Sequence, residues 1–357
     1  MTVVTSAPAK IILFGEHGVN RQQPALATAV DLRTYCRVTP RRDGRYSLTA
    51  GTRAEAGDLA RAAAFKTEID GLREAKALDA IREQARDFFA PTRYVLAHVT
   101  ARTGVGFDVE WRSDLPIGSG LGSGAAANTS MVLAALTAAG VTPDREEIVQ
   151  MAWQGDIIAH GGVASSLDSS TSTYGGLVRY TTAHGAEVLP FSAHLPIVIG
   201  DTQVQHNTAA LNTHVRRWLE EKPVRMRLFG DMGWVVAQAT AALQSGDLAT
   251  LGHLMNIHQL FQEKMGTSIA QAEQLIEAAL AAGSLGAKIS GSGGGGIIIA
   301  LAQPENQAAV AAAIQQAGGQ RFIVTSGADG ARVEPDDAWA SPAPSESEAK
   351  TNYGRVD

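Results

Sequence analysis

Glycine recurs at every second position of residues 118–124, within the stretch "DLPIGSGLGSGAAANTSMVLAAL" that covers residues 114–136. Glycine lets a backbone turn its N–H groups inward without a Cβ clash, and the alanine-rich run that follows predicts a helix whose positive end faces the same point. The stretch therefore predicts a site for an anion such as a triphosphate. Its residues are Gly118, Ser119, Gly120, Leu121, Gly122, Ser123 and Gly124.

Other interpretations of this stretch agree less well with the residues around it. A flexible linker would have polar flanks, whereas the chain here runs directly into an apolar segment. A dinucleotide fingerprint needs G-x-G-x-x-G early in the chain, and Ser123 occupies the place of its third glycine. A Walker loop ends in Gly-Lys-Ser/Thr, and no lysine is present in the stretch. A tight turn with a purely structural role stays open.

The composition sets the limits within which such a site must work. The chain has 357 residues, 45% of them hydrophobic and 18% charged, which is enough for two globular domains. A net charge of −6 offers no basic field for nucleic acid or an anionic membrane, so an anionic substrate needs a local positive site. Cys36 is the single cysteine, and neither a signal peptide nor a run of 18 apolar residues occurs. We expect a cytoplasmic protein without nucleic-acid or membrane partners.

The elements that must position the glycine stretch follow from periodicity and turn residues. "KIILF" predicts a strand that ends in the turn "GEHG", and "DLRTYCRVTPRRDGRYSLTAG" predicts a hairpin that turns at Arg42-Asp43-Gly44. Residues 54–103 indicate helices. Further helices are expected to begin near Gly124 and at Thr142-Pro143-Asp144, where a hydroxyl precedes proline.

The second half of the chain alternates between strands and helices. "GGLVRYTTAHGAEVLPF" predicts a hairpin and "LPIVIGDT" a buried strand; residues 208–283 are expected to be helical, and "GAKISGSGGGGIIIAL" to form strand, loop and strand. A shift in composition near residue 184 predicts a domain boundary. The polar, Pro- and Ser-containing tail is expected to be disordered.

Three segments in order resemble the motifs of one kinase superfamily. They are "SAPAKIILFGEHGV" (residues 6–19), the glycine stretch and "GAKISGSGGGG" (residues 286–296). Together they are similar to the small-molecule kinases that include galactokinase, homoserine kinase, mevalonate kinase and phosphomevalonate kinase. "GEHGV", "HNTAAL" (206–211) and "MNIHQLFQEKMGTS" (255–268) resemble the mevalonate kinases most.

The resemblance implies an α+β fold of two domains with the active site in the cleft between them. We expect residues 1–184 to form the phosphate-loop domain, 185–335 a ferredoxin-like domain, and 336–357 the disordered tail. ATP would be the phosphoryl donor and Mg²⁺ the cofactor. The resemblance also allows a homodimer.

The resemblance also assigns roles to individual residues. Asp168 in "SSLDSSTSTYGG" would orient the acceptor hydroxyl or take its proton, with Lys10 as the lysine that favours its charged form. By itself, an Asp in a Ser/Thr-rich loop indicates a helix cap, and a lone Lys in an apolar strand indicates either an edge residue or a functional charge. The expected substrate-side residues are Glu16, His17, Thr208, Gly293 and Gly294.

The metal site departs from the family pattern. Mevalonate kinases usually have two serines where this chain has Ser123 and Gly124, so the hydroxyl that would bind magnesium is absent. The matching helix carries Asp156 in "WQGDIIAHGG" in place of a glutamate. Because magnesium retains several waters, a water can replace a protein oxygen. We therefore expect Asp156 and Ser123 to hold the ion.

The resemblance implies ATP-dependent phosphorylation of the C5 hydroxyl of mevalonate in isoprenoid precursor biosynthesis. One alternative is a sister kinase that acts on phosphomevalonate or on the 3-hydroxyl of mevalonate. Another is an ATP-dependent decarboxylase of diphosphomevalonate or phosphomevalonate, which would lack a lysine at the position of Lys10. A nucleotide-binding protein without catalysis is the third, and Gly124 is the residue that motivates it.

Overall fold

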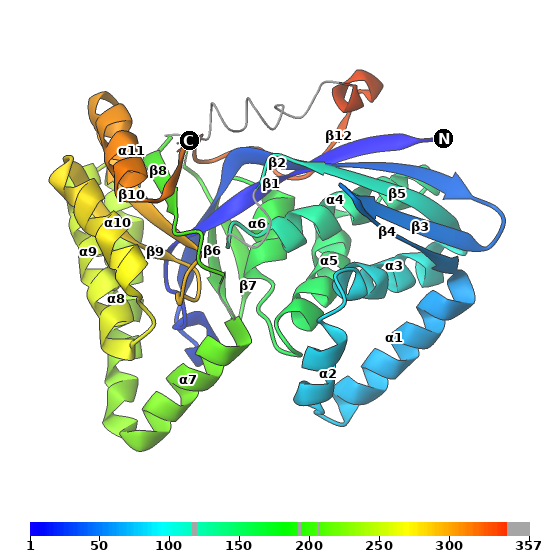
Figure 1. The fold of residues 1–357 in the computed structure, drawn as a ribbon, viewed down its shortest axis with the longest axis horizontal. Coiled ribbons are helices and arrows are strands. Elements are labelled where there is room, and N and C mark those ends of the chain that lie inside the picture. Colours follow the sequence, from blue (N-terminus) through cyan, green and yellow to red (C-terminus); the bar gives the residue numbers. More distant parts are fainter. Residues whose placement is uncertain (116–119, 192–193, 206–207, 341–357) are drawn as a thin grey trace.

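The computed structural model describes residues 1–115, 120–191, 194–205 and 208–340. Two sheets organise this part of the chain (Figure 1). The larger sheet has the order β12-β1-β2-β5-β3-β4, and β6 pairs with β2 and β7 with β6. Its strands are β1 Val3–Phe14, β2 Ala25–Arg41, β3 Arg45–Ala50, β4 Arg53–Asp58, β5 Gly106–Ser113, β6 Leu177–Thr181, β7 Gly185–Leu189 and β12 Arg332–Glu334.

The smaller sheet is antiparallel, with the order β11-β8-β10-β9. Its strands are β8 Pro196–Asp201, β9 Ser284–Ser290, β10 Ile297–Ala302 and β11 Gln320–Thr325. The expected boundary near residue 184 falls in the turn of the β6–β7 hairpin, and both of these strands belong to the larger sheet. The chain enters the smaller sheet at β8 and returns to the larger one at β12.

Helices cover the inner face of the larger sheet and both faces of the smaller one (Figure 1). Those of the first half are α1 Leu59–Glu74, α2 Leu78–Gln84, α3 Ala90–Thr103, α4 Ser123–Ala138, α5 Arg145–Ala159 and α6 Leu167–Tyr174. Those of the second half are α7 Thr208–Glu221, α8 Arg227–Ser245, α9 Leu248–Met265, α10 Ala270–Ala281 and α11 Gln307–Gln316. The 3₁₀ turns are η1 Val19–Arg21, η2 Pro223–Met226, η3 Pro304–Asn306 and η4 Asp336–Trp339.

One apolar core joins the two sheets. Ile11 and Phe14 of β1 belong to the same buried cluster as Ile199 of β8, Ile297 of β10 and Met255 of α9. Burying apolar surface stabilises a protein by about 25 cal/mol per Å², so moving the two parts away from each other would expose the shared core and cost free energy. The core therefore constrains their relative position. The α+β, two-domain prediction is confirmed, and β1 and β2 of the larger sheet both contact the second part.

Most of the elements predicted from the sequence are present, with four exceptions. Residues 53–58, at the start of the segment expected to be helical, form β4, and residues 336–339 of the tail expected to be disordered form η4. Residues 341–357 of that tail lie outside the described residues. The strands on either side of Asp43 form, but they are not a hairpin, because β5 lies between β2 and β3 and runs parallel to β3. The helix expected at Thr142 begins at Arg145, since the side chain of Asp144 accepts a hydrogen bond from the N–H of Glu147 at 2.7 Å and is the actual N-cap. In the part of the chain that is described, no helix has both the length and the apolar character needed to cross a membrane.

Candidate active site

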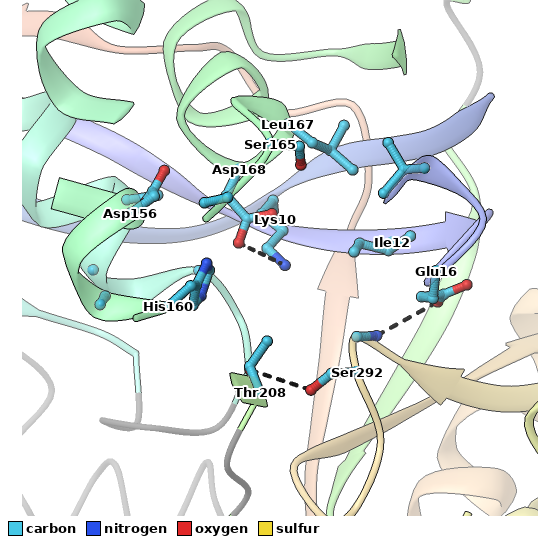
Figure 2. Close-up of a pocket in the computed structure, with 18 of the residues that line it drawn as sticks. Lys10, Ile12, Glu16, Asp156, His160, Ser165, Leu167, Asp168, Thr208 and Ser292 are labelled. Carbon is cyan, nitrogen blue, oxygen red and sulfur yellow. Dashed lines mark hydrogen bonds and ion pairs between the residues drawn. The ribbon is translucent and has the colours of Figure 1, made fainter. Parts of the chain in front are cut away.

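A lysine and an aspartate form an ion pair in a cavity of about 340 Å³ between the two parts of the molecule (Figure 2). Lys10 Nζ lies 3.0 Å from Asp168 Oδ2, and these side chains are 5% and 21% exposed. Lys10 is near the middle of β1, and Asp168 is in the first turn of α6. Two segments about 160 residues apart in the sequence thus bring opposite charges to one wall of the cavity.

The glycine stretch forms the next wall. Gly120, Gly122, Ser123 and Gly124 line the cavity, whereas Leu121 is fully buried in the core. The N–H of Lys10 donates to the carbonyl of Leu121 at 3.0 Å, which fixes the stretch against β1. Of the predicted anion-site residues, Gly118 and Ser119 lie outside the described residues.

The N-terminus of α4 opens into this cavity. Its N-cap is Gly122 with φ of 75°, and no side chain among the described residues caps the helix. The first N–H groups of a helix have no partner within it, and together with the helix dipole they favour an anion. A Cβ on Gly122 would lie 2.9 Å from both Cγ and Cε of Lys10, so the absence of a side chain there leaves room for the lysine.

A second carboxylate lies close to the ion pair. Asp156 in the last turn of α5 is buried and accepts a hydrogen bond from the hydroxyl of Ser169. Burial and the negative charge of Asp168 raise the pKa of Asp156 to about 8. The cavity therefore brings together two acidic groups that repel each other, with Lys10 as the nearby positive charge.

The loop after β1, residues 15–18, holds the two residues predicted for the substrate side. His17 Nε2 bonds the carbonyl of Ser292 at 2.9 Å, and because a carbonyl only accepts, Nε2 carries the proton and Nδ1 is the acceptor. Burial lowers the pKa of His17 to about 4, so the ring is neutral at pH 7. His17 has φ of 59°, which is uncommon for a residue other than glycine.

Glu16 has a partner that its sequence pattern did not indicate. Its Oε1 lies 2.5 Å from Nζ of Lys288 in β9, and both side chains are at most 1% exposed. Burial raises the pKa of Glu16 and lowers that of Lys288, while the pairing opposes both shifts. Oε2 lies 3.4 Å from His258 Nε2, but that nitrogen accepts the N–H of Gly15 at 3.0 Å and has no proton to donate. Oε2 is therefore buried without a hydrogen-bond partner among the described residues.

The remaining predicted residues divide into those inside and those outside the cavity. Thr208, the first residue of α7, lines it and lies 3.2 Å, oxygen to oxygen, from the hydroxyl of Ser292. Gly293 and Gly294 do not line it. Their Cβ positions would lie 2.3 Å from the carbonyl oxygen of Thr267 and 2.8 Å from Leu211, so the absence of side chains there lets the loop pack against α7 and the end of α9.

Several cavity residues were not predicted from the sequence. His160 lies beside the Lys10–Asp168 pair in Figure 2, and burial lowers the pKa of its ring. Asn212 of α7 and Ser292 line the cavity from the second part of the molecule. Lys288 does not line the cavity but pairs with Glu16, which does. Like Lys10 it is a lysine inside an apolar strand, a pattern that indicates either an edge residue or a functional charge.

Comparison with known proteins agrees with this geometry. Residues 90–176 match the GHMP kinases N terminal domain, and residues 239–320 match GHMP kinases C terminal. A mevalonate kinase of Thermococcus onnurineus is 35% identical over 350 residues, which cover 94% of this chain and 99% of the relative.

Two solved structures show a similar fold. The Methanococcus jannaschii mevalonate kinase has a TM-score of 0.76 at 20% identity, covering 92% of this chain and 99% of that one. The L. major mevalonate kinase, solved in complex with R-mevalonate, has a TM-score of 0.72 at 24% identity and covers 91% and 96%. With the ion pair, the glycine stretch and near full-length similarity in agreement, the chain belongs to the mevalonate kinase family of the GHMP kinases.

Proposed function

We propose that the protein transfers the γ-phosphoryl group of ATP to the C5 hydroxyl of mevalonate. The observation that carries this proposal is the Lys10–Asp168 pair, 3.0 Å apart, in a cavity that the N-terminus of α4 also lines. Phosphoryl transfer requires mainly that two reactants are positioned and that charge is neutralised. A base, a cation and an anion-binding helix end in one cavity meet these requirements.

The chemistry follows from the two charged side chains. Asp168 is only part-buried and can accept a hydrogen bond from the acceptor hydroxyl, which orients the oxygen toward the γ-phosphorus. As the new O–P bond forms and the bond to the β–γ bridging oxygen breaks, the hydroxyl proton passes to Asp168 and ADP leaves. Lys10 fixes the carboxylate and places a positive charge near the transferring group.

The residues present are consistent with a magnesium ion. Asp156 and Asp168 repel each other, and a divalent cation would remove that repulsion. Ser123 adds a hydroxyl to the lining of the same cavity. The described residues contain no cluster of three or more His, Cys, Asp or Glu that could hold a metal alone, which agrees with an ion that takes its other ligands from phosphates and water. Asp156 and Ser123 would hold Mg²⁺. Bound there, it would neutralise charge on the ATP phosphates.

The acceptor side of the cavity has the groups that a small hydroxy acid needs. His17 and Thr208 come from different parts of the chain and line the cavity with Asn212. The Thermococcus onnurineus relative that covers 94% of this chain is a mevalonate kinase, and the L. major mevalonate kinase was solved with R-mevalonate. These similarities support mevalonate as the acceptor.

Phosphorus NMR of the purified protein tests the proposal directly. With ATP, Mg²⁺ and mevalonate we expect a new phosphomonoester signal that matches 5-phosphomevalonate, together with ADP. Lys10→Met should reduce the rate by at least about 10²-fold, because the charge beside the transferring group is lost. Turnover only with 5-phosphomevalonate as acceptor, or release of carbon dioxide, would contradict the proposal.

A further inference from the structure

A seam of side-chain hydrogen bonds connects β1 and the loop after it to the smaller sheet. Ser290 Oγ accepts the N–H of Ile12 at 2.9 Å, His258 Nε2 accepts the N–H of Gly15, and Lys288 pairs with Glu16. The three partners Ser290, His258 and Lys288 are at most 4% exposed and do not line the cavity. They do not reach a ligand there themselves, but Ser290 and Lys288 bind Ile12 and Glu16, which line the cavity, and His258 binds Gly15, which precedes Glu16.

The loop held by this seam has a backbone conformation that needs outside support. His17 adopts φ of 59°, which costs a residue with a side chain about 1–2 kcal/mol. Strain of this kind persists only where the surrounding contacts determine the conformation. The contacts to Glu16 and Gly15 lie directly before His17 in the chain, so they are placed to provide that support.

The Glu16–Lys288 pair is the strongest contact in the seam. Both charges are removed from water, and Lys288 Nζ also donates to the carbonyl of Ile289. Removing one partner of a buried pair leaves the other charge uncompensated, which is far more costly than losing an exposed pair. The carboxylate of Glu16 is therefore restrained in one orientation.

We infer that Lys288 and Ser290 are positioning residues, through which the smaller sheet sets the place of Glu16 and His17 for the acceptor substrate. This inference rests on the proposed function for the identity of the acceptor, but not for the positioning itself. ATP is expected to bind on the glycine stretch. No hydrogen bond or ion pair joins Lys288 or Ser290 to the described residues of that stretch, 120–124. Their loss should therefore affect one substrate and not the other.

Steady-state kinetics of Lys288→Met test the inference. We expect the KM for mevalonate to rise about ten-fold while the KM for ATP changes less than about two-fold. The matched control is Arg93→Met, which breaks the Arg93–Glu55 pair, another buried pair with a distance of 2.7 Å that does not line the cavity. This control should lower the melting temperature without changing the KM for mevalonate. Equal changes in both KM values, or an unchanged KM for mevalonate, would overturn the inference.

A milder variant decides the question if Lys288→Met does not fold. Ser290→Ala removes only the acceptor of the Ile12 N–H, and we expect a rise of about three-fold in the KM for mevalonate. A wild-type KM in this variant would overturn the inference.

A measurement without substrate separates this inference from the proposed function. In ¹⁵N-histidine NMR spectra of the ligand-free protein, Lys288→Met or Ser290→Ala should shift the ring signals of His17, and Arg93→Met should not. Unchanged His17 signals would overturn the positioning role. A wild-type protein that does not phosphorylate mevalonate would refute the proposed function alone, and the histidine signals would still decide the positioning role.

Discussion

Adding a methyl group at Gly122 should lower activity more than the accompanying loss of stability can explain. Gly122 is the N-cap of α4, and in Gly122→Ala the new Cβ would lie 2.9 Å from two carbons of the Lys10 side chain. Carbon atoms pack at about 3.5–4.0 Å, so Lys10 or the helix must move by about 0.6 Å or more. The 3.0 Å contact between Lys10 and Asp168 cannot persist unchanged through such a shift.

The size of the effect follows from the geometry. A misplacement of about 1 Å in a catalytic group can cost about 10²-fold in rate, so we expect kcat to fall about 10- to 100-fold. Alanine at φ of 75° also costs about 1 kcal/mol of folding free energy. The clash adds about 1–3 kcal/mol if the core does not relax.

The other end of the same helix provides the control. Gly140 has φ of 83°, and a Cβ placed there meets no atom within 4 Å. Gly140→Ala should therefore cost about 1 kcal/mol of stability from the backbone alone and leave kcat unchanged. Urea denaturation and a coupled ADP-release assay measure the two quantities. Wild-type kcat in Gly122→Ala, or an equal loss of kcat in Gly140→Ala, would refute the reasoning.

Three further predictions concern the metal, the missing hydroxyl and the acid limit of stability. Asp156→Ala should raise the Mg²⁺ concentration for half-maximal turnover about ten-fold, and an unchanged Mg²⁺ dependence would remove Asp156 from the site. Gly124→Ser should fold normally, because a Cβ there meets no atom within 4 Å, and should lower the Mg²⁺ requirement; a higher requirement would argue against a metal on that side of the loop. On folding, the pKa of His17 falls from 6.5 to about 4, so between these pH values the unfolded chain binds a proton that the folded chain does not. The contribution of His17 to the free energy of unfolding is therefore complete above pH 6.5 and is lost as the pH falls toward 4. Urea titrations should show a loss of about 3 kcal/mol from this group over that window and a shallower slope in His17→Asn; equal slopes would contradict the assignment.

Local patterns predicted those parts of the fold that depend on neighbours in sequence. The alternation in "KIILF" and the glycine stretch each correspond to an element that forms where expected. The Asp-Gly turn correctly marks the end of β2 and the start of β3, although these strands do not pair as a hairpin. The pairing of β5 between β2 and β3 could not be predicted in this way. It depends on helices that carry the chain from the edge strand β4 back to the interior of the sheet, between β2 and β3. The Asp-Gly turn signals only where a strand ends.

In the candidate site, too, the sequence identified some residues, whereas the contacts of others are seen only in the fold. Lys10 and Asp168 were recognised by resemblance, and the structure places them in contact. Lys288 is a single charged residue in an otherwise apolar strand, and only the fold shows that it pairs with Glu16. The glycines at 293 and 294 indicated close approach, but the sequence could not show that the approach is to the protein's own chain.

The position of β12 has a consequence for the order in which the protein can fold during synthesis. Residues 332–334 pair with residues 4–6 of β1, and the carbonyls of Asp329 and Gly330 accept hydrogen bonds from the buried Arg33 of β2. Domains generally fold as they leave the ribosome, the N-terminal one first. Here β1 is synthesised first, and the edge that later pairs with β12 stays unpaired while the whole smaller sheet is translated. Unpaired strand edges can pair with other chains. The nascent protein is therefore most exposed to misassembly until β12, the last strand of the described residues, emerges and covers this edge.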